Sequence, residues 1–233
     1  LVLHFCCLKD PVSTLSGIIE MMGNIQATSG VSIILLSCVC FILQYYPDFH
    51  SQENSDLANW IQAPILRHAV SSDPNNMFNL NRFLQAGGAK LLPFPDVVLC
   101  ELLLRFESIG VDIAAKPIGY LIDINPDSHS SLFWRSFPNL NSTSDSLSEQ
   151  SKSFLILLSK IIPIAEICPP KDQTQLISLI KICENNCILI NSPENTGQQL
   201  NFRQTEISLT ILRWLVSKQC YCPEKLSDQY TSG

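Results

Sequence analysis

Most polar residues between Asp96 and Ile109 lie on a narrow stripe, while the remaining positions of this segment are mostly apolar. Glu101, Arg105 and Ser108 are spaced i, i+4 and i+7, so they share one side of an α-helix. A helix that packs on a single core needs an apolar stripe only about 100° wide. The wider apolar surface predicts a helix that is covered from more than one side, as in layered or stacked helices.

The same pattern recurs near the end of the chain, where two further segments carry one polar stripe on an otherwise apolar helix. The stripes consist of Gln175, Ser178 and Lys181, and of Glu206, Thr210, Arg213 and Ser217. Prolines stand at the entry or inside several apolar segments, where they start, kink or end helices. The chain is thus predicted to repeat a unit of helix, short break and helix.

Hydrophobic period and end signals together predict about nine to eleven helices. Asp10 and Asp73, each followed by proline, are expected N-caps, and Ser128 is expected to cap a short helix. Kinks are expected at Pro64 and Pro163. The expected helical ranges are 10–23, 29–46, 56–70, 73–87, 96–109, 128–137, 153–167, 172–187 and 204–218. Residues 120–124 fit a strand, an extended segment or a helix end.

Composition divides the chain into two helical parts and two polar segments. Residues 138–152 are rich in Ser and Asn and are predicted to form a loop between an N-terminal part, 1–137, and C-terminal helices, 153–222, of the same domain. Residues 223–233 are expected to be a polar tail. The chain begins with an apolar run, Leu1 to Leu8, instead of Met, which is the pattern expected of a piece of a longer protein.

These helical segments resemble the armadillo/HEAT class of α-solenoids. The resemblance rests on Val31–Tyr46, Pro95–Ile109, Ser153–Ile167, Asp172–Cys187 and Gln204–Lys218, without a signature motif. It implies an all-α fold of stacked helical hairpins, an irregular solenoid fragment, and a role in binding other proteins. The chain also resembles, again without a shared motif, the vertebrate meiosis inhibitor family of armadillo-like regulators of meiotic DNA breaks. That resemblance implies a regulator in a nuclear complex.

Charge and hydropathy exclude two classes of partner. The net charge is −6 and no basic run is present, so direct nucleic acid binding is not expected. Charged residues make up only 15% of the chain, which indicates extensive buried surface. Val31–Tyr46 is the one membrane candidate, but it is shorter than the ~20 residues that a span needs and lacks Lys/Arg flanks. A central buried helix is the preferred interpretation.

Ten cysteines raise the question of disulfides. Most of those in the predicted helices lie in apolar runs, where a free cysteine behaves as a small hydrophobe. This placement favours a reducing compartment, the cytoplasm or the nucleus. Asn141-Ser142-Thr143 is an N-glycosylation acceptor triplet, so an extracellular helical domain with Asn141 glycosylated stays open as an alternative.

Motifs for metal, cofactor and catalytic chemistry are not found in the sequence. Cys38-x-Cys40 and Cys220-x-Cys222 do not match the C-x₂₋₄-C spacing of zinc sites. The only glycine cluster, Gly87-Gly88, is explained by a helix end and a turn. Nucleophile signatures such as G-x-S-x-G are missing. No catalytic, cofactor or metal residue is therefore assigned, and a helical enzyme with dispersed site residues is the alternative.

Aromatic residues beside arginines are the remaining candidates for function. Phe133, Trp134 and Arg135 form one such group, and Arg213 and Trp214 form another on the last predicted helix. Trp, Phe and Arg are favoured anchors in protein interfaces. Burial of Phe133 and Trp134 under the adjoining loop is the competing interpretation. The sequence thus predicts a non-enzymatic scaffold that binds a protein partner, with an undetermined oligomeric state.

Overall fold

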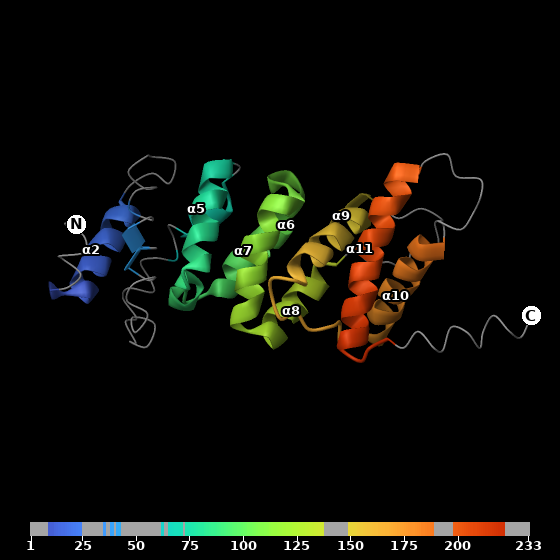
Figure 1. Cartoon of the computed structure of the whole chain (residues 1–233). Coiled ribbons are helices and arrows are strands. Elements are labelled where there is room, and N and C mark those ends of the chain that lie inside the picture. The colour runs from blue at the N-terminus through green and yellow to red at the C-terminus, as the bar shows by residue number, and fades with distance from the viewer. Residues whose placement is uncertain are drawn as a thin grey trace, which may run out of the picture.

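The described part of the chain is built from α-helices. The structure is a computed structural model that describes residues 9–24, 35, 38–39, 41–42, 62, 65–71, 73–137, 149–188 and 198–221. Its elements are α2 (Pro11–Gly23), α5 (Pro74–Gln85), the 3₁₀ helix η2 (Gly88–Leu91), α6 (Pro95–Ile109), α7 (Val111–Ile124), α8 (Pro126–Arg135), α9 (Glu149–Ile161), α10 (Gln173–Ile188) and α11 (Gln198–Ser217) (Figure 1). These residues contain no strand, which confirms the all-α class.

Side-chain caps explain where several helices begin. The Asp10 carboxylate accepts from Ser13 N at 3.0 Å, and the Asp73 carboxylate accepts from Asn75 N at 2.9 Å, so both predicted N-caps are confirmed. The prediction that Ser128 caps α8 is wrong. Asn125 is the cap, its amide oxygen accepts from Ser128 N at 3.4 Å, and Pro126 occupies the first turn, where its missing N–H costs nothing.

Three other boundaries differ from expectation. Residues 111–124 form one helix, α7, although Pro117 lies inside it. α9 ends at Ile161, before Pro163, instead of running to 167 with a kink, because the residue before a proline disfavours helical backbone angles. α11 begins at Gln198, six residues before the predicted start at Gln204.

Some predicted features fall partly or wholly outside the described residues. In the range 29–46 only five residues are described, and Leu35, Val39 and Ile42 among them are buried. The kink at Pro64, most of the 138–152 loop, Asn141 and the tail 223–233 are not described. In the parts of the chain that are described, no helix is both long and apolar enough to cross a bilayer.

From α5 onward, the described α-helices are arranged as a row of four, with three further helices packed beside it. α5 contacts α7, α7 contacts α9, and α9 contacts α11, so these four helices form one row. α6 and α8 contact each other and both pack on α7, while α10 packs on α11. Figure 1 shows the helices following one another from α2 to α10 and α11.

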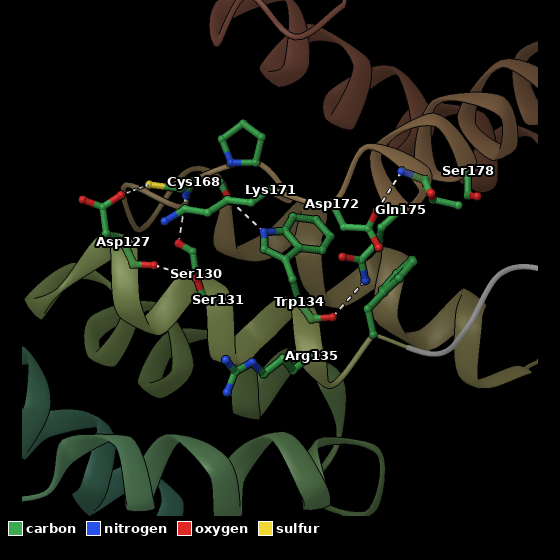
Figure 2. Close-up of a pocket in the computed structure, with 13 residues that line it drawn as sticks. Asp127, Ser130, Ser131, Trp134, Arg135, Cys168, Lys171, Asp172, Gln175 and Ser178 are labelled. Atoms are coloured by element: carbon green, nitrogen blue, oxygen red, sulfur yellow. Dashed lines mark hydrogen bonds between the residues drawn. The ribbon is translucent and has the colours of Figure 1, made fainter.

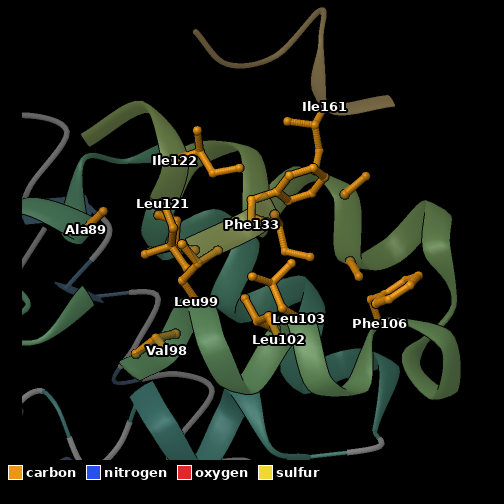
Figure 3. Packing of buried hydrophobic residues seen from close by; sticks show 14 of the residues in the cluster. Ala89, Val98, Leu99, Leu102, Leu103, Phe106, Leu121, Ile122, Phe133 and Ile161 are labelled. Carbon is orange, nitrogen blue, oxygen red and sulfur yellow. The ribbon is translucent and has the colours of Figure 1, made fainter. Parts of the chain in front are cut away.

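The core runs continuously through this arrangement. α6 contributes five buried side chains to it, and these meet residues of α7, α8 and α9, including Leu121, Ile122, Phe133 and Ile161 (Figure 3). The α6 residues are Val98, Leu99, Leu102, Leu103 and Phe106. Burial of each such side chain stabilises the folded state by about 1.5–3 kcal/mol. This range is an upper value, because a realistic unfolded chain already buries part of its apolar surface.

The expectation that α6 is covered from more than one side is not met by the described residues. Val97 and Cys100 are exposed, and Leu104 is 80% exposed. The reason is geometric, because α7 and α8 both lie against the inner half of the helix. The outer half keeps both its polar stripe and three apolar side chains in solvent.

A single glycine joins α6 to α7. Gly110 serves both as the C-cap of α6 and as the N-cap of α7, with φ 99° and ψ 127°. Only glycine adopts this region readily, because a Cβ atom would clash with the backbone. The one-residue link forces the two helices into direct contact as a hairpin.

A buried histidine, His68, forms a hydrogen-bond network between the segment before α5 and α5 itself. His68 is fully buried, its Nδ1 lies 3.1 Å from Asn76 Oδ1, and Asn76 Nδ2 donates to Ser71 Oγ at 2.7 Å. This network assigns the proton to Nδ1 of the neutral ring. Among the described residues Nε2 has no hydrogen-bond partner. Burial, with a smaller contribution from Arg67, lowers the pKa of His68 below its ordinary 6.5.

We expect this histidine to make stability depend on pH. The unfolded chain takes up the proton near pH 6.5 and the folded chain at lower pH, so acidification below about 6.5 favours the unfolded state. The melting temperature should fall between about pH 7.5 and 5.5, and it should fall less in His68→Asn, which keeps a donor near Nδ1. Thermal melts followed by circular dichroism test this, and equal pH slopes in both proteins would contradict it.

Candidate functional site

A pocket of about 540 Å³ opens between α8, the connection 162–172 and α10 (Figure 2). Its lining combines two aromatic side chains with hydroxyl groups and four charged side chains. The residues are Asp127, Ser130, Ser131, Trp134, Arg135, Phe137, Cys168, Pro169, Lys171, Asp172, Thr174, Gln175 and Ser178.

Hydrogen bonds from α8 hold both walls of the pocket. Trp134 Nε1 donates to the Cys168 carbonyl at 2.7 Å, and Cys168 N donates to Ser130 Oγ at 2.9 Å. From the other wall, Gln175 Nε2 donates to the Trp134 carbonyl at 2.9 Å. Figure 2 shows these bonds converging on α8 from the connection and from α10. The pocket is therefore preformed, since its walls are tied to a common helix.

An aromatic cluster supports the pocket from behind. Trp134 packs edge-to-face against Phe133 and Phe137, with ring centroids 5.3 and 5.8 Å apart, and it stacks on Trp214 of α11 at 6.4 Å. Phe154 of α9 lies 4.6 Å from Phe133 and 4.4 Å from Phe137. Such pairs contribute about 0.5–1.5 kcal/mol each beyond the burial of their area. Rings from α8, α9 and α11 thus fix the position of Trp134.

Two cations lie at the rim without an ion pair to another described residue. Arg135 and Lys171 are exposed, and both also line a second hollow of about 400 Å³ that continues along α8. The two rim carboxylates have internal partners, since Asp127 accepts from Cys168 Sγ at 3.7 Å and Asp172 accepts from Thr174 N at 2.9 Å. The cations are therefore free to meet an anionic group of a ligand.

The pocket lining combines several kinds of polar group. Its hydroxyl, amide and cationic groups can bind carboxylates and peptide groups. It also holds two carboxylates and one thiol, Cys168, which donates to Asp127 at 3.7 Å, and no histidine is among the lining residues. Within the described part of the chain, no group of three or more His, Cys, Asp or Glu side chains could hold a metal ion.

Three of the five residues predicted to bind a partner are buried. Phe133, Trp134 and Trp214 lie within the aromatic cluster, so their rings offer little surface to another protein. Arg135 and Arg213 are exposed, the first at the pocket rim and the second on α11. The structure brings the aromatic members of the two sequence groups together and leaves the arginines on the surface. Partner binding by the arginines stays a prediction.

Sequence reasoning missed the residues that form the opposite wall of the pocket. Gln175 is predicted only as part of a polar stripe, and the sequence assigns no site role to Cys168 or Lys171. Pro169-Pro170 marks a connection in the sequence, but the pairing of Cys168 with Ser130 spans 38 positions and has no local signal. Only the tertiary contact between α8 and the connection 162–172 reveals it.

The described cysteines are free thiols. Cys38, Cys100, Cys168, Cys183, Cys187 and Cys220 form no disulfide. Burial raises the pKa of Cys183 to about 12 and also raises the pKa of Cys187. A thiol with a raised pKa is a poor nucleophile, because the thiolate is the reactive form. Cys183 and Cys187 are therefore packing residues, as their place among apolar neighbours predicts.

Comparisons with known proteins add no family to this picture. No protein-family model matches the chain, and no curated protein or solved structure is significantly similar to it.

Proposed function

We propose that the chain is a non-enzymatic scaffold that binds another protein, and that it forms a segment of an irregular α-solenoid. The observation that carries the proposal is the row α5–α7–α9–α11, with α6 and α8 packed on α7 and α10 packed on α11. In solenoids each helical pair buries its faces against neighbouring pairs instead of a central core, and the extended surface binds partners. The armadillo/HEAT resemblance of the sequence points in the same direction.

The proposed docking site for the partner is the pocket between α8 and α10. Arg135 and Lys171 are exposed there, while Asp127 and Asp172 are engaged by protein donors. An acidic peptide segment fits this chemistry, with its carboxylates on the two cations and its backbone groups on Gln175 and the hydroxyls. The six free thiols support placement in the cytoplasm or nucleus, where a role in a meiotic or DNA-break complex is the more specific proposal.

Charge reversal at the rim is expected to weaken partner binding. In Arg135→Glu/Lys171→Glu, two attractive contacts become repulsive, so affinity for the partner should fall about tenfold or more. The partner is first captured by the purified full chain from a nuclear extract and identified by mass spectrometry. Its affinity for each variant is then measured by biolayer interferometry at fixed salt.

Lys116→Glu on α7 is the matched control, because Lys116 is exposed and lies outside the pocket lining. It changes the net charge in the same direction and should leave affinity unchanged. Equal binding by the rim variant and the control would reject the pocket as the docking site. Failure to capture any stoichiometric partner, combined with stabilisation by a metabolite, would reject the scaffold proposal itself.

A further inference from the structure

A regular apolar strip runs along the exposed side of α11. Phe202, Leu209 and Val216 are spaced by seven residues, and their side chains are 69%, 41% and 43% exposed. Seven residues are nearly two turns, so the three side chains lie above one another along the helix. A phenylalanine with this exposure, aligned with two further apolar residues, is typical of a surface that another helix covers.

The strip lies between the side of α11 that contacts α10 and the side that borders α9. Thr205 and Ser208 bond to Asn186 of α10, whereas Trp214 stacks on Trp134 of α8. At 100° per residue, the strip lies beside the α10-facing side and roughly opposite the side that carries Trp214. Figure 1 shows α10 and α11 at the C-terminal end of the helical row. A helix placed on the strip would therefore extend the row beyond α11.

We propose that the strip binds the same strip of a second copy of this chain, with the two α11 helices antiparallel about a twofold axis at Leu209. The pairing places Leu209 against the partner's Leu209 and Phe202 against the partner's Val216, so the apolar strip is complementary to itself. This surface is separate from the α8–α10 pocket, so either proposal can fail without the other.

Charges beside the strip fit the same twofold arrangement. Glu206 lies three residues before Leu209 and Arg213 four residues after it, both exposed and on the same flank. With a rise of about 1.5 Å per residue, the two sit about 4.5 and 6 Å from the pivot in opposite directions. After the twofold rotation, Glu206 and the partner's Arg213 differ in height along the helix axis by only about 1.5 Å, so they can form an ion pair. The same pair forms a second time by symmetry.

Glu206 lines a hollow of about 210 Å³ together with Arg203 and with Lys160 of α9. Lys160 bonds to Asp112, and Lys160 together with the weaker field of Arg203 lowers the pKa of the Asp112 carboxyl. Glu206 and Arg213 form no ion pair with another described residue. A parallel helix of another protein would need its own acidic and basic residues at matched positions. A second copy supplies both charges automatically, and this is why we favour it.

Charge exchange tests the proposal on the full chain. Sedimentation velocity over a concentration series should show a reversible dimer of the unmodified protein. Arg213→Glu turns both Glu206–Arg213 pairs of the dimer into pairs of like charge. It should therefore raise the dissociation constant of the dimer about tenfold or more. Glu206→Arg/Arg213→Glu exchanges the charges and should restore the dissociation constant to within about threefold of the original, because only the direction of each pair changes.

Two further variants separate this interface from others. Leu209→Glu buries a carboxylate at the twofold axis and should leave only monomer, with an unchanged helical circular dichroism spectrum. Leu104→Glu on α6 introduces the same charge at a leucine that is also exposed, outside the strip, and should leave the dimer intact. A monomer at about 100 µM, a dimer insensitive to Leu209→Glu, or failure of the exchanged pair to restore association would each overturn the proposal. Binding of the strip to a different protein instead would overturn it as well.

Discussion

Replacement of Trp134 by alanine is expected to lower the free energy of unfolding by about 3–5 kcal/mol. The side chain is buried, its ring contacts three phenylalanines and Trp214, and its Nε1 donates to the Cys168 carbonyl. Truncation leaves a large cavity at the meeting point of α8, α9 and α11 and also leaves the carbonyl without its donor. The loss should appear as a lower midpoint of urea denaturation, followed by circular dichroism at 222 nm.

Two variants show which part of the interaction matters. Trp134→Phe keeps most of the ring contacts but removes the hydrogen bond, so it should cost about 1–3 kcal/mol and less than alanine. Leu104→Ala removes an apolar side chain that is already in solvent and should stay within about 0.5 kcal/mol. If Trp134→Ala behaved like Leu104→Ala, the aromatic cluster could not be the centre of this part of the fold.

Introduction of valine at Gly119 should destabilise the protein by about 2–3 kcal/mol, through overpacking. Gly119 is buried in α7, where a Cβ atom would lie 2.9 Å from Ile164 Cγ2 and 3.3 Å from Ile164 Cβ. These distances are too short for two carbon atoms, and the β-branched Ile164 has no flexible end that could swing aside. The turn after α9 would have to move away from α7, which thermal or urea denaturation would detect.

The same substitution in α2 provides the matched control. At Gly17 an added Cβ meets no atom within 4 Å, so Gly17→Val should change stability by no more than about 0.5 kcal/mol. Glycine is unfavourable inside a helix, so replacing it by valine gives both variants the same small gain in helix propensity. A large loss at Gly119 with none at Gly17 identifies close helix approach as the cause. Equal effects would point to backbone preference alone.

Local signals in the sequence correctly predicted those elements whose ends are set by nearby residues. Asp73 and Pro74 begin α5, Gly110 ends α6, and Asp172 caps α10, because each cap acts within three residues of its own backbone. The expectation failed where two local signals competed. Asn125 and Ser128 are both good caps, and Asn125 prevails because Pro126 fits only the first helical turn.

The candidate site was only half accessible to sequence reasoning. The aromatic group at Phe133 and Trp134 stood out by composition, and its burial was one of the two interpretations. The opposite wall, with Cys168 and Gln175, comes from chain positions more than 30 residues away and carries no motif. Helix pairing decides such contacts, and pairing depends on the shapes of whole faces instead of on short patterns.

The wide apolar faces of the helices are a property of the sequence, since the 3.6-residue period and the Pro, Gly and Asp signals act locally. They determine that the chain is helical and roughly where each helix lies. What each apolar face meets was decided only by tertiary packing. On α6 the inner half is buried while Leu104 stays in solvent, and on α11 one face holds Trp214 against Trp134 while Phe202, Leu209 and Val216 stay exposed. The hydrophobic effect is not directional. It therefore favours burial of an apolar face without specifying which surface the face packs against.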